Sequence, residues 1–327
     1  MQDISRRGFT IGAGALAAGL AMPGILRAQD KYPSRDVHFI CAFPPGSGAD
    51  VIVRWYAEKL RPIMGVNIVV ENKVGALAHL ATEYTVRAKP DGYTIYVHGP
   101  ASLAINQYVI KNSTVDVTKD IVIAGAINRQ PMMMMVKHDS PWKTVADVTK
   151  AVRAKGDKAT YGISNPVGKV MGALYKNHEK LEAVEVTYRT ASDALNDLAS
   201  GAIDYGMFDN IFGAAQARAG RVRLLGISMP ERLQAMADIP TMSEQGVPMS
   251  VIGGFAAMVP SATPQPIVDR IFAMFEQVTR TPEAKTFLNT IASDPWVTTQ
   301  EKAQAGFIEE VKAYGEYVRL AKIEPQG

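Results

Sequence analysis

Short apolar runs alternate with segments of helical periodicity in the part of the chain that follows residue 36. Three runs have the length and composition of buried strands, at 37–43, 67–71 and 94–98. Between them, apolar residues recur at helical spacing over 50–64 and 76–88. A β-α-β-α-β series predicts a parallel sheet with helices on both faces.

The same alternation continues through the rest of the chain. The predicted strands are 160–163, 184–188, 204–208 and 223–228. The predicted helices are 144–154, 168–176, 193–200 and 299–321. Strands and helices that alternate in this way place the protein in the α/β class.

We expect two longer apolar stretches, 130–136 and 251–259, to cross between structural units. The first contains four consecutive methionines, 132–135, whose adaptable side chains are more typical of a buried strand than of a metal or oxidation site. Two crossings make one unit discontinuous, so we predict two α/β lobes joined by crossing strands. The predicted boundaries are 29–130 plus 250–327 for lobe 1 and 131–249 for lobe 2.

The N-terminal segment has the layout of a secretory signal peptide. The pair Arg6-Arg7 precedes an uncharged stretch, 8–26, and Ala28 offers a small-residue cleavage site. Paired arginines before a weakly apolar stretch are typical of a twin-arginine signal, so we predict a signal peptide over 1–28 and a mature protein in the periplasm. The alternative is a transmembrane anchor, which Pro23 and the glycines of the stretch disfavour.

Composition excludes several classes of function. The 35 basic and 32 acidic residues give a net charge of +3, which is too small and too evenly spread for a nucleic-acid-binding surface. The single cysteine, Cys41, excludes an intrachain disulfide and a thiolate zinc cage. The five histidines lack metal-ligand spacing, and no G-x-S-x-G nucleophile elbow occurs. We therefore predict no metal, no cofactor and no catalytic residue.

The loop after the first predicted strand is a candidate binding element. In an open parallel sheet, ligands bind beyond the carboxyl ends of the strands, where the next helix offers unpaired N–H groups to an anion. Gly46 and Gly48 allow a ligand to approach the backbone closely. Asp50 is either a first-turn acid that orders the loop or a direct acceptor for the ligand. The candidate residues here are Phe43, Gly46, Ser47, Gly48, Ala49 and Asp50.

A dinucleotide-binding loop is the rival interpretation of this segment. Gly46-x-Gly48 follows a strand and Glu71 ends the next strand, as in that motif. The third glycine of the motif is replaced by Val51, and two prolines occupy the turn, so the sequence disfavours a nucleotide site.

A second loop, 163–169, also joins a predicted strand to a predicted helix. Ser164, Asn165 and the backbone at Gly168 are candidate hydrogen-bond donors. Lys169 is either a point charge for the ligand or a solvated lysine at the helix start.

Three further candidates lie close to the carboxyl ends of other predicted strands. Ser102 follows the strand 94–98. Arg189 follows the strand 184–188 and faces either the cleft or solvent, whereas Asp209 ends the strand 204–208 and is expected to face the cleft.

A series of short motifs runs through the chain in a specific order and spacing. The motifs are Tyr32-Pro-Ser-Arg35, Phe43-Pro-Pro-Gly46 with Asp50, Val70-Glu-Asn72, Lys89-Pro-Asp-Gly-Tyr-Thr94, Ala104-Ile-Asn106, Tyr161-Gly162, Tyr188-Arg189, Met207-Phe-Asp-Asn210 and Asp238-Ile-Pro-Thr241. In these motifs the chain resembles the Bug family, the extracytoplasmic solute receptors of tripartite tricarboxylate transporters.

The resemblance implies a periplasmic-binding-protein fold of the type II-like class, which closes on a small organic acid in a cleft between two lobes. It implies that the loops 43–50 and 164–169 grip a carboxylate with backbone amides and hydroxyls. It also implies that the partners are the large and small membrane subunits of such a transporter. We expect the receptor to be a monomer.

The two loops depart from the pattern of the family. Ala49 lacks a hydroxyl, and the second loop is short and contains Pro166 and Val167. Lys169 is expected to replace the neutral donors that this loop has lost. A second class of function stays open, namely an exported, cofactor-dependent oxidoreductase of α/β fold.

Overall fold

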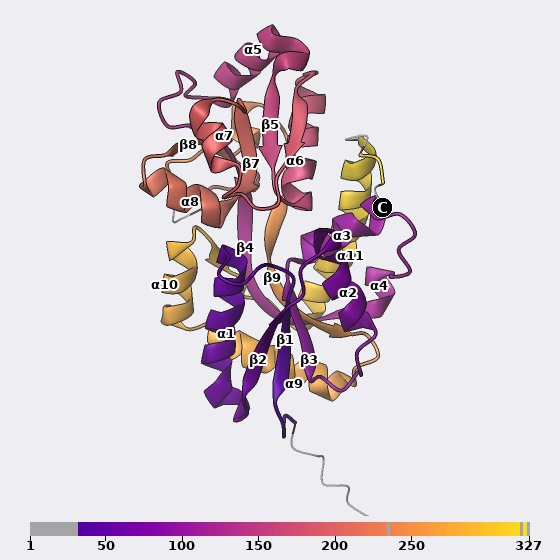
Figure 1. Cartoon of the computed structure of the whole chain (residues 1–327). Coiled ribbons are helices and arrows are strands. Elements are labelled where there is room, and N and C mark those ends of the chain that lie inside the picture. Colours follow the sequence, from indigo (N-terminus) through magenta and orange to yellow (C-terminus); the bar gives the residue numbers. More distant parts are fainter. Residues whose placement is uncertain (1–31, 234–235, 321–322, 326–327) are drawn as a thin grey trace, which may run out of the picture. The chain divides into compact units, whose positions relative to one another are not determined.

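A computed structural model describes residues 32–233, 236–320 and 323–325 of the chain (Figure 1). The predicted signal peptide, 1–28, lies outside these residues. Strands and helices alternate along most of the described chain, as the sequence predicts. No helix within these residues has the length and apolar character needed to cross a membrane.

The first group of strands forms as predicted. β1 (Val37–Cys41) pairs in parallel with β2 (Ile68–Asn72) on one side and with β3 (Thr94–His98) on the other. The connections run through α1 (Gly48–Met64) and α2 (His79–Val86). β1 is buried along most of its length, which explains its uninterrupted apolar sequence.

The parallel pairing predicted for the first three strands is confirmed, and two further strands make the sheet as a whole mixed. β9 (Ile252–Pro260) runs antiparallel to β3, and β4 (Ile121–Lys137) runs antiparallel to β9. β4 is also longer than the predicted strand 130–136, because the apolar segment that precedes it continues the strand. The predicted crossing stretches are therefore two long neighbouring strands.

β4 changes its partners at one point along its length. Its first part, up to Pro131, pairs with β9, and its second part, from Met132, pairs with β7 (Tyr205–Asp209) and β8 (Val222–Ile227). Figure 1 shows β4 and β9 passing from the first group of strands to the second. This change of partners supports the predicted lobe boundaries at 130/131 and 249/250, which stay a prediction.

The second group of strands is built on β5 (Thr160–Ile163). β5 lies between β6 (Val184–Thr187) and β7 and is parallel to both. The helices of this group are α5 (Val145–Lys155), α6 (Pro166–His178), α7 (Leu195–Ser200) and α8 (Asn210–Arg218). All four predicted strands of this part of the chain are present within one or two residues.

Two short segments differ from the prediction. The helix expected from residue 76 begins at His79, because Ala76, Leu77 and Ala78 all have positive φ. α3 (Pro100–Val109) was not predicted, since nearly all of its residues are buried and its sequence lacks a polar face.

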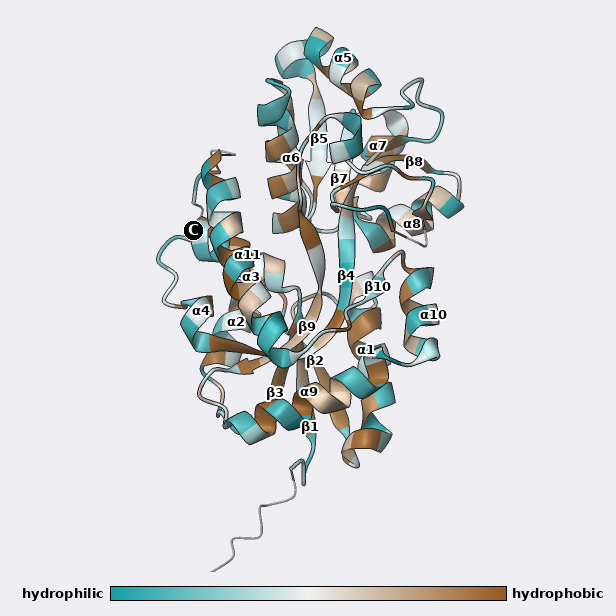
Figure 2. Ribbon diagram, turned by 180° about the vertical axis from the view of Figure 1, so that it is seen from behind, coloured by the Kyte–Doolittle hydropathy of each residue, from teal (hydrophilic) through white to brown (hydrophobic). Residues whose placement is uncertain are grey.

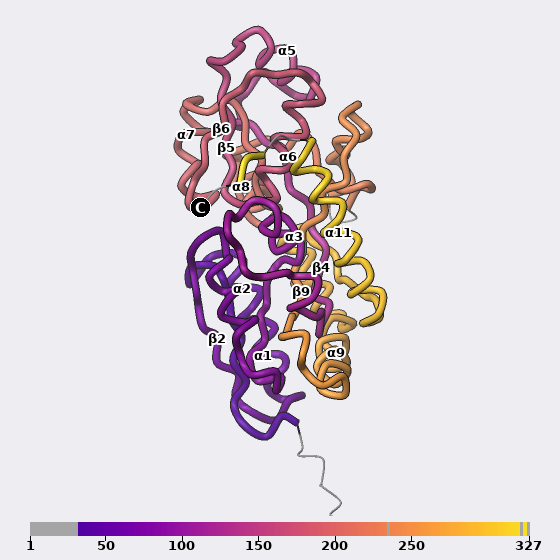
Figure 3. Tube along the Cα trace, turned by 90° about the vertical axis from the view of Figure 1, so that its right-hand side faces the viewer, coloured from indigo at the N-terminus to yellow at the C-terminus, as the bar shows by residue number. Residues whose placement is uncertain are grey.

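The short helix α4 (Val117–Asp120) precedes β4. The described C-terminal part adds three helices and a short strand: α9 (Gln265–Thr279), α10 (Pro282–Thr290), β10 (Asp294–Pro295) and α11 (Gln300–Leu320). Figure 3 shows α11 running beside β4 and β9, and its residues contact β4 and α3.

The core is apolar in both groups of strands. The methionines 132–135 are at most 3% exposed, which confirms that they form a buried strand. Phe275 stacks on Phe39 and on Tyr56 in the first group, and Tyr161 stacks on Tyr205 in the second. The middle of β4 is hydrophilic in Figure 2, because the polar residues 128–130 interrupt the apolar sequence of this continuous strand.

This polar run makes a buried hydrogen-bond network where β4 crosses β9. The Asn128 side chain accepts a hydrogen bond from the Phe255 N–H at 2.9 Å and donates to Gln130 and to the hydroxyl of Ser293. Gly254 has a φ of 147°, and a Cβ there would lie 2.1 Å from the carbonyl oxygen of Asn128. Only glycine fits this crossing.

We expect Gly254→Ala to destabilise the fold by about 3 kcal/mol or more, because it adds backbone strain and a clash with main-chain atoms. Gly306→Ala is the matched control, since a Cβ at this exposed position of α11 meets nothing within 4 Å. It should stabilise the helix by up to about 1 kcal/mol. Urea unfolding measures both, and equal midpoints for wild type and Gly254→Ala would contradict the prediction.

Candidate functional site

The loop 43–50 comprises the connection from the carboxyl end of β1 to α1 and the first turn of α1. Ser47 is the N-cap of α1, and Gly46 has a φ of 78°, a conformation that favours glycine. A Cβ on Gly48 would lie 2.5 Å from Cγ2 of Ile211, near the start of α8. The loop of the first group of strands therefore touches the start of α8, a helix of the second group, whereas the sequence analysis paired it with the loop 164–169.

Asp50 holds this loop in shape. Its carboxylate is 1% exposed and accepts hydrogen bonds from the Gly46 N–H at 2.9 Å, from Arg54 at 2.8 Å and from Asn72 at 2.8 Å. Asn72 also donates to the carbonyl oxygen of Phe43 at 2.8 Å. Of the two roles open to Asp50, the structure shows that of ordering the loop.

The electrostatics of Asp50 agree with this role. Burial alone would raise the pKa of the carboxyl group. The hydrogen bonds from Arg54, Asn72 and the Gly46 N–H outweigh burial, so the pKa of Asp50 lies below its ordinary value of 3.8. The group is a carboxylate at neutral pH, and its charge is compensated within the protein.

The helix start after β5 is capped by its own side chain. Asn165 is the N-cap of α6 and accepts a hydrogen bond from the Gly168 N–H at 2.8 Å. A Cβ on Gly168 would lie 2.5 Å from the carbonyl oxygen of Met207, so glycine is needed here for packing of α6 on β7. The N–H of Gly168 is therefore already hydrogen-bonded within the protein. The hydroxyl of the half-buried Ser164, in contrast, has no hydrogen-bond partner among the described residues.

Lys169 is placed differently from either alternative of the sequence analysis. Its ammonium lies 3.0 Å from Oε1 of Glu185 on β6. Glu185 also accepts hydrogen bonds from the hydroxyls of Tyr161 and Thr187. Lys169 is therefore neither a solvated lysine nor a free charge, because an acidic residue of the same group of strands already pairs with it.

Three other candidates lie at the predicted strand ends. Asp209 is the N-cap of α8 and accepts a hydrogen bond from the Phe212 N–H at 2.9 Å. Burial raises the pKa of its carboxyl group, and this effect outweighs the lowering effect of hydrogen bonds from backbone N–H groups. Arg189 is exposed and forms no ion pair within the described residues. Ser102 is 8% exposed in the first turn of α3, whose N-cap, Gly99, provides no side-chain cap.

His98 is a further candidate that the sequence analysis missed. It ends β3 and is 1% exposed, with ring contacts to Phe43 at 4.9 Å, to Tyr96 at 5.1 Å and to Phe255 at 6.4 Å between centroids. Neither ring nitrogen has a hydrogen-bond partner among the described residues. Burial lowers the pKa of His98 to about 3, so the imidazole is neutral. Its place at a strand end is the signal that sequence reasoning had available.

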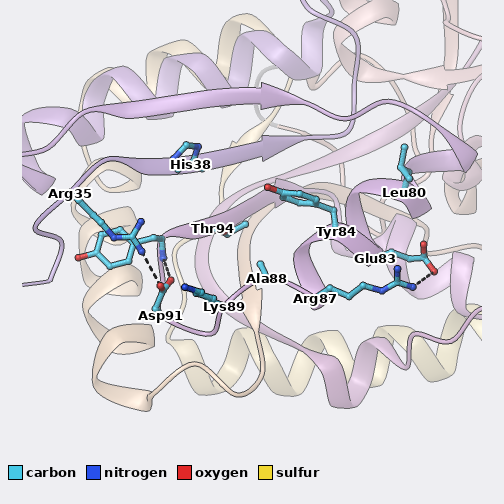
Figure 4. Close-up of a pocket in the computed structure, with 11 residues that line it drawn as sticks. Arg35, His38, Leu80, Glu83, Tyr84, Arg87, Ala88, Lys89, Asp91 and Thr94 are labelled. Carbon is cyan, nitrogen blue, oxygen red and sulfur yellow. Dashed lines mark hydrogen bonds and ion pairs between the residues drawn. The ribbon is translucent and has the colours of Figure 1, made fainter.

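A separate hollow lies away from these loops. It has a volume of about 520 Å³ and lies at the amino ends of β1 and β3, where Arg35, His38 and Thr94 line it (Figure 4). Arg35 pairs with Asp91 at 2.9 Å on its wall. We therefore take the strand-end loops, and not this hollow, as the candidate site.

Metal and thiol chemistry find no support in the described part of the chain. No group of three or more His, Cys, Asp or Glu side chains is placed there to hold a metal ion. Cys41 is buried in β1, and burial raises the pKa of its thiol to about 11.

Comparison with known proteins decides the class of this site. Residues 52–321 match the family described as "Tripartite tricarboxylate transporter family receptor". The chain belongs to this family. The resemblance to Bug receptors is thereby confirmed, and the protein is a solute receptor and not an enzyme. The alternative of an exported oxidoreductase is wrong.

Similar proteins match most of the length of this receptor. The chain is 27% identical to "UPF0065 protein in tcbD-tcbE intergenic region" of Pseudomonas sp. (strain P51) over 284 residues, which are 84% of each chain. It is 24% identical to "Protein BugT" of Bordetella pertussis over 325 residues, covering 97% of this chain and 98% of BugT.

Solved structures show the same fold. The receptor is similar to R. palustris Rpa4515 with adipate, with a TM-score of 0.84, 24% identity and coverage of 90% of this chain and 100% of that one. The periplasmic binding protein BugD gives a TM-score of 0.81, 24% identity and the same coverage. This receptor therefore has the predicted periplasmic-binding-protein fold of two α/β lobes joined by crossing strands.

We expect Asp50→Asn to lower the free energy of unfolding at pH 7 by about 2 kcal/mol or more, because Arg54 and the Gly46 N–H lose their anionic acceptor. The pKa of Asp50 is lowered by folding, so the carboxylate stabilises the fold above about pH 3.8 and this contribution is lost as the pH falls further.

Urea unfolding of both proteins at pH 7 and at pH 3 tests this expectation, and the gap between them should narrow at pH 3. Asp269→Asn is the control: this exposed aspartate in α9 accepts only from Gln265, so its replacement should change stability by less than about 0.5 kcal/mol. An Asp50→Asn protein as stable as the control at pH 7 would contradict the role given to Asp50.

Proposed function

We propose that this receptor captures a small organic carboxylate between its lobes, in the periplasm, and delivers it to the large and small membrane subunits of a tripartite tricarboxylate transporter. The carrying observation is that the start of α1 touches the start of α8 through Gly48 and Ile211. An anion at this junction lies near the positive ends of two helices. Family membership supports the same function.

Uncommitted donors for the carboxylate surround this junction. The main-chain N–H groups of Gly48 and Ala49 have no acceptor within the described residues. The Ser47 hydroxyl accepts from the Asp50 N–H, so its own proton is free to be donated to a ligand. At this junction the proposed grip therefore uses neutral donors and helix dipoles, as the sequence predicted for the loop 43–50.

The structural neighbours support the class of ligand. Rpa4515 was solved with adipate, and MatC from Rhodopseudomonas palustris was solved with bound malate. MatC is 22% identical to this chain, with a TM-score of 0.79 and coverage of 88% of this chain and 100% of MatC. Both ligands are small dicarboxylates, so we include small dicarboxylates among the candidate ligands.

Of the charged candidates, Arg189 is the one retained as a ligand contact. It is exposed near the carboxyl end of β6 and has no acidic partner in the described part of the chain. Lys169 is assigned a structural role through its ion pair with Glu185.

The remaining parts of the proposal are export by the twin-arginine segment 1–28 and action as a monomer.

The function predicts that small carboxylates stabilise the protein against heat. A ligand at a hundred times its Kd adds about 2.7 kcal/mol to the free energy of unfolding. We expect at least one of succinate, malate and adipate to raise Tm, with their alcohol analogues, such as hexane-1,6-diol for adipate, as uncharged controls. No shift with any carboxylate, or an equal shift with the diol, would contradict the proposed ligand class.

Removing the charge of Arg189 and removing that of Lys169 should have different effects on the Kd of a carboxylate. Arg189→Ala should weaken binding of a carboxylate about ten- to a hundredfold, since a charge-assisted hydrogen bond is worth about 1.5–3 kcal/mol. Lys169→Ala should change Kd by less than about twofold, because its charge is already paired with Glu185. Isothermal titration with the acid that gives the largest thermal shift measures both. The reverse order of effects would restore Lys169 as the ligand's cation.

A further inference from the structure

His98 is a buried polar side chain with nothing to bind. Both ring nitrogens are shielded from solvent and lack a hydrogen-bond partner among the described residues. An unsatisfied buried polar atom costs the fold stability, so such a group calls for an explanation. A phenylalanine would fill the same aromatic cluster without this cost.

The imidazole lies beside the candidate loop. Its ring contacts the ring of Phe43, the first residue of that loop, in a tilted arrangement with 4.9 Å between centroids, and lies edge-on to Phe255 of the crossing strand β9. β3 is parallel to β1, so the carboxyl ends of the two strands lie at the same edge of the sheet. His98 thus belongs to the edge where ligands of α/β sheets bind.

The residues that follow His98 are also uncommitted. Gly99 starts α3 without a side-chain cap, and the N–H of Ala101 has no acceptor within the described residues. The hydroxyl of Ser102, which a Cβ on Gly99 would approach to 3.8 Å, has no hydrogen-bond partner there either. A helix start, a hydroxyl and a buried imidazole with unmet hydrogen-bonding capacity therefore occur within five consecutive residues, 98–102.

We infer that His98, with Ser102, forms a neutral hydrogen-bonding subsite that recognises a hydroxyl substituent of the bound organic acid. This inference rests on the proposed function and narrows its ligand to hydroxylated carboxylates. His98 thereby acts as a specificity-determining residue beside the carboxylate grip of the loop 43–50.

The surroundings of His98 favour a hydroxyl over a second carboxylate. A neutral imidazole has one donor and one acceptor nitrogen, and a hydroxyl can pair with either. A carboxylate only accepts, so it pairs with the protonated nitrogen alone. The rings of Phe43, Tyr96 and Phe255 also make the environment apolar, where a full charge loses its hydration.

The inference requires the ring of Phe43 to move when the ligand binds. Phe43 is only partly buried, whereas the neighbouring His98 is almost completely buried. For a ligand to reach the ring nitrogens, the Phe43 ring must rotate away from the imidazole. The carbonyl oxygen of Phe43 stays fixed by Asn72 at 2.8 Å, so this movement leaves the backbone of the loop in place.

Two pairs of acids that differ by one hydroxyl test the inference: malate against succinate, and 3-hydroxyadipate against adipate. Isothermal titration should show the wild-type receptor binding the hydroxylated member of at least one pair about three- to tenfold more tightly. His98→Phe keeps the aromatic volume and should reduce this ratio to about one. His98→Met is the second apolar variant should the first fail to fold.

Tyr96→Phe is the matched control. The Tyr96 ring stacks on His98, but its hydroxyl donates to the carbonyl oxygen of Ala78, so the preference for the hydroxylated acid should persist. His98→Phe should also raise the Tm of the ligand-free protein, because two unsatisfied nitrogens are removed.

The outcomes separate this inference from the proposed function. Equal binding within both pairs by the wild type, or an unchanged ratio in His98→Phe, would overturn the role of His98 while leaving carboxylate binding intact. Failure of all four acids to bind the wild type would count against the carboxylate function itself, and against this inference with it.

Discussion

β4 is a member of both groups of strands, and the placement of the second group depends on it. The strand pairs with β9 up to Pro131 and with β7 and β8 after it. Where β4 crosses β9, the Asn128 side chain accepts a hydrogen bond from the Phe255 N–H, next to a shift in the register of these two strands. A buried polar network of this kind is stable only when every member is paired, so it specifies one register and one position for Gly254.

Charge compensation inside the protein sets the electrostatic character of the candidate site. Asp50 is paired with Arg54, and Lys169 is paired with Glu185, so the loops 43–50 and 163–169 present mainly neutral donors. A ligand anion held by backbone N–H groups and helix starts is recognised through geometry, because these donors cannot reorient as a flexible lysine can. His98 is likewise a neutral group of fixed orientation, because the rings of Phe43 and Phe255 enclose its imidazole.

Much of the fold was predictable because its signals are local. Strands such as 94–98 and 160–163 and the final helix of the chain follow from apolar spacing alone, and their predicted bounds agree closely with the structure. α3 escaped prediction because burial on nearly all sides removes the polar face on which helical periodicity depends. The direction of β9 and β4 also escaped, since an apolar run has the same sequence pattern in either orientation.

For the site, the sequence by itself determined the loops and their caps, because Ser47, Asn165 and Asp209 each bind an N–H only three residues further along the chain. Tertiary structure alone decided the partners that lie far apart in sequence. It pairs Lys169 with Glu185. It also brings Asn72 within hydrogen-bond distance of Asp50 and Phe43, and it encloses His98 between Phe43 and Phe255. A hydrogen bond within one helical turn follows from local geometry, whereas an ion pair between a helix and a neighbouring strand depends on how the sheet is assembled.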